Sequence, residues 1–96
     1  MSEHALVRAT VTPQIVTILS KYYGIGLDEA LRRFYESKTA ANYADDETGL
    51  YGQSALYIAG MFIMEQDGQI DEKRLYAATR PDNSAASELK RKNRPD

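Results

Sequence analysis

The side chains of this chain that could take part in chemistry are mainly carboxylates, and three of them stand together in one polar segment. Asp45, Asp46 and Glu47 follow one another directly before Thr48 and Gly49. Catalytic carboxylate pairs work because one pocket holds them in two different environments, which neighbours in an acidic loop lack. We therefore predict a solvated loop at this segment.

The other residues that could act as nucleophiles or metal ligands are isolated. His4 is the only histidine, it stands near the N-terminus, and the chain has no cysteine. A metal site needs several ligands at a set spacing, and a nucleophilic serine needs a base within hydrogen-bond reach. The sequence therefore predicts no catalytic residue, no metal site, no cofactor and no small-molecule substrate, and we expect that the protein is not an enzyme.

A second acidic segment, Glu65–Asp71, has the central glycine and isoleucine spacing of a calcium-binding EF-hand loop. In that register the first ligand position falls on Ile63, and the twelfth, which requires a bidentate carboxylate, falls on Arg74. We predict no calcium site, because two necessary ligands are absent. The same residues fit a helix that ends at Gly68 and a new helix capped by Asp71.

The short segment 24–26 contains two glycines between two predicted helices, which is the outline of a DNA-binding helix-turn-helix motif. A recognition helix presents its first turn to bases and phosphates, and here that turn carries Asp28 and Glu29. The arginines that follow, Arg32 and Arg33, each stand four residues from an acid. The charge pattern therefore argues against nucleic-acid binding.

Two amphipathic helices are predicted in the first half of the chain. The dipeptide Thr12-Pro13 begins a helix over 13–23, because threonine caps free amides and proline has a helical φ at the first position. A second helix is predicted over 27–38, with apolar residues on one face and charges on the other. Residues 6–12 leave two alternatives open, a short strand or an extension of the first helix.

The second half predicts further helical segments. Residues 40–44 add one or two helical turns before the polar loop 45–49. The run 55–64 is apolar on every side and is preceded by Ser54 or Gly52 as a cap. A helix that is apolar all round is enclosed in a core or shared with another chain, and a small helical domain encloses a helix with difficulty.

Length and composition complete the expected architecture. The chain has 96 residues, of which 43% are hydrophobic and 27% charged, as in one globular domain. A last short helix follows Asp71. We predict an all-α fold, a small bundle of three to four helices, in a single domain over 1–79. A polar, basic and disordered tail is predicted over 80–96.

Charge and hydropathy restrict the partners. Residues 1–79 carry 7 Lys and Arg against 11 Asp and Glu, a net charge of −4, whereas residues 80–96 carry 5 against 3, a net charge of +2. The acidic body argues against broad phosphate binding. The longest apolar run, 55–64, is about half of the ~20 residues that cross a bilayer, and the N-terminus lacks the apolar core of a secretory signal. We expect a cytoplasmic protein without a membrane segment.

The apolar segment predicts an interface. Aromatic residues and methionines concentrated on one such segment are the composition of an interface centre. We expect self-association, most simply as a homodimer, or binding of another protein, with Phe62 in the core. The predicted partner-binding residues are Leu50, Tyr51, Tyr57, Met61 and Met64.

Three segments of the sequence carry a resemblance to a known family. Residues Leu27–Ser37, Asp45–Tyr51 and Ser54–Ile58 together resemble a family of small bacterial proteins of unknown function. Members of that family are often encoded beside toxin-like ADP-ribosyltransferase genes, so the resemblance implies an antitoxin or an accessory partner of a toxin. It supplies no catalytic residues. The predicted function is therefore a non-enzymatic protein-binding module, and the alternative is a self-associating structural homodimer.

Overall fold

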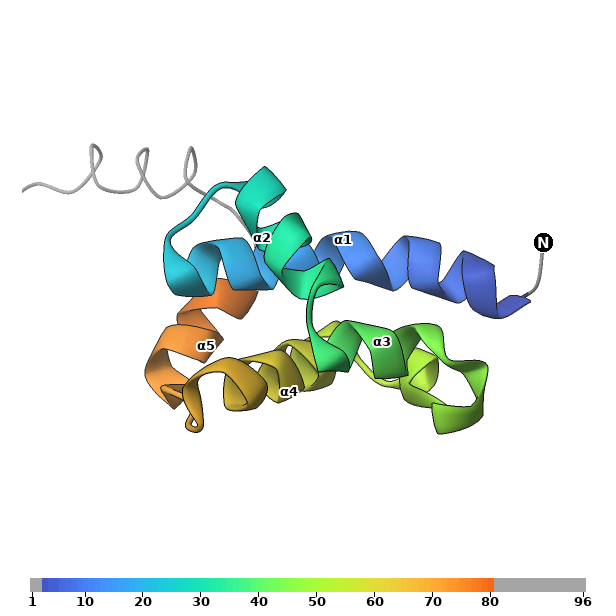
Figure 1. Ribbon diagram of the computed structural model, residues 1–96. Coiled ribbons are helices and arrows are strands. Elements are labelled where there is room, and N and C mark those ends of the chain that lie inside the picture. Colours follow the sequence, from blue (N-terminus) through green and yellow to red (C-terminus); the bar gives the residue numbers. More distant parts are fainter. Residues whose placement is uncertain (1–2, 81–96) are drawn as a thin grey trace, which may run out of the picture.

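The computed structural model describes residues 3–80 of the chain, and this part is built from helices alone (Figure 1). The predicted all-α class is confirmed. The predicted number of three to four helices is wrong, because the described residues form five α-helices and two short 3-10 helices. These are α1 (Glu3–Tyr23), α2 (Leu27–Tyr35), α3 (Lys38–Ala44), η1 (Asp46–Thr48), η2 (Leu50–Gly52), α4 (Ala55–Asp67) and α5 (Glu72–Thr79).

Helix α1 begins at Glu3, ten residues before the predicted start, and passes through Pro13. Of the two alternatives left open for residues 6–12, the structure has the helical extension. A proline inside a helix removes one backbone hydrogen bond and strains the preceding turn. The extension persists because its side chains bind other elements: Arg8 donates to Asp46 in η1, and Thr12 is hydrogen-bonded to Tyr43 in α3.

Helix α2 ends at Tyr35, so the predicted end at residue 38 is wrong. The cause is Ser37, which is buried between the two helices. Its hydroxyl donates to the carbonyl of Phe34 and accepts from the amide of Ala40, which ends α2 and caps α3 at the same point. Serine stabilises such a helix start because it satisfies an amide that has no partner inside the helix.

A second cap on α3 comes from another helix. The carboxylate of Glu65 in α4 accepts from the amides of Lys38 at 2.9 Å and Thr39 at 2.8 Å, and from the hydroxyl of Thr39 at 2.7 Å. Burial raises the pKa of Glu65, but the hydrogen bonds from Thr39 and Lys38 outweigh it, and the pKa is lowered. A carboxylate at a helix N-terminus also complements the helix dipole.

The core lies between α1 and α4, with α2, α3 and α5 packed around this pair (Figure 1). Of the two predicted caps of α4, Ser54 or Gly52, the structure has Ser54, whose hydroxyl accepts from the amide of Tyr57. The six largest fully buried side chains come from α1, α2 and α4. They are Phe34, Phe62, Ile15, Leu19, Ile58 and Ile63.

The second acidic segment forms the turn between α4 and α5. Gly68 ends α4 in the left-handed conformation at φ 75°, and Asp71 caps α5 by accepting from the amide of Arg74. Both features were predicted and are confirmed. Asp67 accepts from the hydroxyl of Tyr23, whose pKa is raised by burial and by this bond. The carboxylate of Asp67 thus joins α4 to α1, and that of Asp71 caps α5.

Among residues 3–80, no helix has both the length and the apolarity that crossing a membrane requires. The predicted tail over 80–96 lies, from residue 81 onward, outside the described residues.

Candidate functional site

An open groove of about 730 Å³ lies between α1, α2 and α3. Its α1 wall runs from Ala5 to Thr17, and its α3 wall runs from Ala40 to Ala44. Small side chains on α1 and α3 leave the space open, because alanines fill little of the volume between helices. The α2 wall consists of larger side chains.

Helix α2 has two apolar lines, and only one of them is buried. Ala30 and Phe34 are 1% and 0% exposed, whereas Leu27, Leu31 and Tyr35 are 56%, 37% and 64% exposed. The exposed three recur every four residues, so they form one continuous line along the helix, and all three line the groove. The opposite face is charged, with Glu29 bound to Arg32 and Arg33, and Arg32 bound to Glu36. We call Leu27, Leu31 and Tyr35 the α2 stripe.

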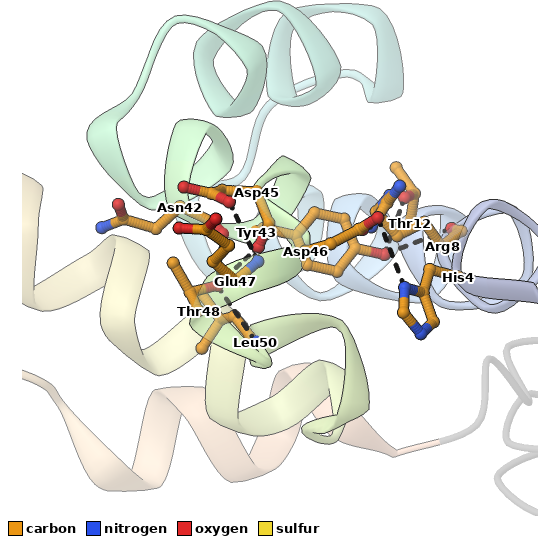
Figure 2. A network of polar contacts seen from close by, with 10 residues as sticks. All are labelled: His4, Arg8, Thr12, Asn42, Tyr43, Asp45, Asp46, Glu47, Thr48 and Leu50. Carbon is orange, nitrogen blue, oxygen red and sulfur yellow. Dashed lines mark hydrogen bonds and ion pairs between the residues drawn. The ribbon is translucent and has the colours of Figure 1, made fainter. Parts of the chain in front are cut away.

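Tyr43 forms the floor of the groove. Its ring, 3% exposed, reaches from α3 to α1, where its hydroxyl donates to the carbonyl of Arg8 at 3.2 Å and lies 3.0 Å from the hydroxyl of Thr12 (Figure 2). Burial raises the pKa of Tyr43, and the hydrogen bond with Thr12 and the charge of Arg8 oppose this only in part. The hydroxyl therefore joins α3 to the N-terminal half of α1 as a neutral group.

Tyr43→Phe is expected to loosen this junction while leaving the ring in place. The substitution removes the hydroxyl that serves Thr12 and Arg8, at a cost of about 1 kcal/mol in unfolding free energy. Amide hydrogen exchange over residues 4–12 should accelerate more than exchange in α4. Tyr57→Phe is the matched control, because Tyr57 is 54% exposed. Loss of its hydroxyl should change neither the unfolding free energy nor the amide hydrogen exchange over residues 4–12. Equal exchange in wild type and Tyr43→Phe would show that the hydroxyl does not hold α1.

A polar cluster beside the groove fixes the start of α1 (Figure 2). The guanidinium of Arg8 donates to one oxygen of Asp46 at 2.7 Å, and Nδ1 of His4 lies 3.3 Å from the other. The imidazole of His4 also stacks on the ring of Tyr51 at 3.9 Å between centroids. The hydrogen bonds from Arg8 and then His4 lower the pKa of Asp46. All three carboxylates of the predicted loop are exposed, and the middle one, Asp46, anchors the helix.

The five residues predicted to bind a partner differ in how far they are buried. Leu50 is 8% exposed and belongs to the core, and Tyr51 is half-buried against His4. Tyr57, Met61 and Met64 lie on one face of α4, since they are four and three residues apart. Tyr57 and Met64 are exposed, and Met61 is half-buried against the core.

The groove was not predicted from the sequence, although the sequence of α2 contains one signal for it. The apolar line of Leu27, Leu31 and Tyr35 stands beside a second line of Ala30 and Phe34, so α2 has more apolar surface than one packed face needs. The sequences of the α1 and α3 walls did not indicate a groove. Alanines on two helices are as typical of a closely packed helix contact as of an open groove. Their distance from α2 depends on the tertiary arrangement.

Taken together, residues 3–80 form a small all-α domain with an open apolar groove on one side. Within these residues no three His, Cys, Asp or Glu side chains gather as a metal site would require. In comparisons with known proteins, the chain matches no family model, no curated protein and no solved structure. The function is therefore inferred from the groove and the side chains that line it.

Proposed function

We propose that this protein is a non-enzymatic protein-binding module and that its partner docks in the groove between α1, α2 and α3. The observation that carries the proposal is the α2 stripe: three large apolar side chains stay exposed on a helix whose other face is fully charged. Exposed apolar side chains that line a concave surface are typical of protein interaction sites. The antitoxin role implied by the family resemblance is one form of such a module.

The shape of the groove favours a helix as the docking element. Its α1 wall, from Ala5 to Thr17, spans about 18 Å, which is about three turns of an α-helix. Helices that bind in grooves insert apolar side chains spaced by three and four residues, and the α2 stripe has the matching spacing. A small molecule would leave the rim uncovered, because Leu27 and Tyr35 are more than half exposed.

Selection from a displayed library of amphipathic helices tests the proposal. The library keeps leucines at positions i, i+4 and i+7 and randomises the polar positions, and it is selected against the full chain. Leu31→Glu should weaken the selected helices by at least about thirtyfold, because a charge at an interface centre loses hydration without gaining a partner. Leu6→Glu is the control, since Leu6 is 56% exposed and does not line the groove. Helices that bind both variants like the wild type would exclude the groove as their site.

A second candidate, self-association through α4, rests on a different observation. Leu56, Tyr57 and Met64 are 41%, 54% and 49% exposed on this apolar helix. A two-fold dimer would cover such a face with its own copy. Light scattering of the full chain at micromolar concentration separates the candidates: a dimer that Met64→Glu dissociates supports self-association, and a monomer contradicts it.

A further inference from the structure

Several polar side chains line the groove and can donate hydrogen bonds. Most of them are already bonded to other groups of the protein. The hydroxyl of Thr17 donates to the carbonyl of Pro13 at 2.8 Å, and that of Thr12 is hydrogen-bonded to Tyr43. The guanidinium of Arg8 is bound to Asp46, so its charge is balanced within the domain. The donors left for a partner in the groove are the hydroxyl of the exposed Tyr35 and the remaining N–H groups of Arg8, whose charge is already paired.

Two acceptors that line the groove, the carbonyl of Ala9 and the carboxylate of Asp28, remain open to a partner. Pro13 has no amide hydrogen, so the carbonyl of Ala9 lacks the donor that a regular helix would supply, and both residues line the groove. Asp28 also lines the groove, and among residues 3–80 no ion pair involves it. Its neighbour Glu29 holds both Arg32 and Arg33.

The charges around the groove also favour a partner that donates hydrogen bonds. Arg8 and Asp28 are the charged residues among those that line the groove, and the charge of Arg8 is balanced by Asp46. The groove is therefore left with a net negative charge. Residues 1–79 as a whole carry a net charge of −4. Complementary charge speeds association and selects among partners, so this surface favours a cationic partner.

We propose that the partner element is a basic amphipathic helix from another protein, with apolar anchors on the α2 stripe and a lysine or arginine directed at Asp28. The open carbonyl of Ala9 provides a second acceptor for its donors. This inference rests on the proposed function and specifies the chemistry of the partner. Asp28 contributes selectivity, whereas the α2 stripe contributes most of the affinity.

The helices selected against the full chain provide the test. We expect lysine or arginine to be enriched at one or two of their randomised positions. Asp28→Lys should weaken these helices by at least about fivefold and should reduce the salt dependence of binding. Glu72→Lys is the matched control, because it makes the same charge change in the first turn of α5, away from the groove, and should leave affinity nearly unchanged.

The outcomes separate the two proposals. Helices that lose binding to Leu31→Glu, but show no basic enrichment and bind Asp28→Lys normally, would overturn the basic partner and keep the groove. Helices that bind Leu31→Glu normally would overturn the proposed function itself. A dimer that Leu31→Glu dissociates would assign the groove to a second copy. Binding that appears only after Lys90, Arg91 and Lys92 are changed to glutamate would assign it to the chain's own C-terminal segment.

Discussion

Phe62→Ala is expected to lower the unfolding free energy by about 3–5 kcal/mol, the largest stability change predicted for this chain. The ring of Phe62 is 2% exposed, and its centroid lies 6.1 Å from that of Phe34 and 6.2 Å from that of Tyr23. Removing it leaves a cavity at the point where α1, α2 and α4 meet. A small domain is stable by roughly 5–15 kcal/mol, so much of the variant should be unfolded at 37 °C.

Urea unfolding followed by circular dichroism measures this effect. Met64→Ala is the matched control, because Met64 lies two residues further along the same helix and is 49% exposed. Its substitution should cost less than about 1 kcal/mol, as is usual for exposed positions. If Phe62→Ala costs no more than Met64→Ala, the three helices do not share the core described here.

Glu65→Gln is expected to cost about 1–2 kcal/mol through the loss of charge-assisted hydrogen bonds at the start of α3. The amide oxygen of glutamine can still accept from Thr39, but the amide nitrogen would face the backbone N–H of Lys38, donor against donor. The cost should concentrate in α3, where amide hydrogen exchange over residues 38–44 should accelerate. Glu72→Gln is the control, since this acidic residue lies in the first turn of α5 and forms no ion pair within residues 3–80.

The contribution of Glu65 should depend on pH in a defined direction. Its pKa in the folded protein lies below the ordinary value of 4.5, so the carboxylate stabilises the fold above that value. This stabilisation is lost as the pH falls through the lower folded pKa. Unfolding free energies of wild type and Glu65→Gln should therefore differ at pH 7 and converge at acidic pH. A difference that stays constant between pH 7 and pH 3 would contradict the tertiary cap.

The sequence by itself determined the features that depend on neighbouring residues. The α-helical class, the end of α1 at Tyr23 and the start of α5 after Asp71 are as predicted, and α4 starts after Ser54, one of its two predicted caps. Each of these rests on contacts within about one helical turn, such as a side-chain oxygen that accepts from an amide three residues later. Such contacts are visible as short patterns, so the start and end of α4 and the start of α5 could be predicted.

Only the tertiary structure decided the start of α1 and the shape of the groove. The helix continues through Pro13 because Arg8 and Thr12 bind residues 38 and 31 positions away in the sequence, which no local pattern reveals. In the same way, Glu65 caps a helix that begins 27 residues earlier. The α2 stripe is exposed because α2 turns Ala30 and Phe34 into the core, which leaves Leu27, Leu31 and Tyr35 at the groove between α1, α2 and α3. That arrangement depends on how three helices pack together.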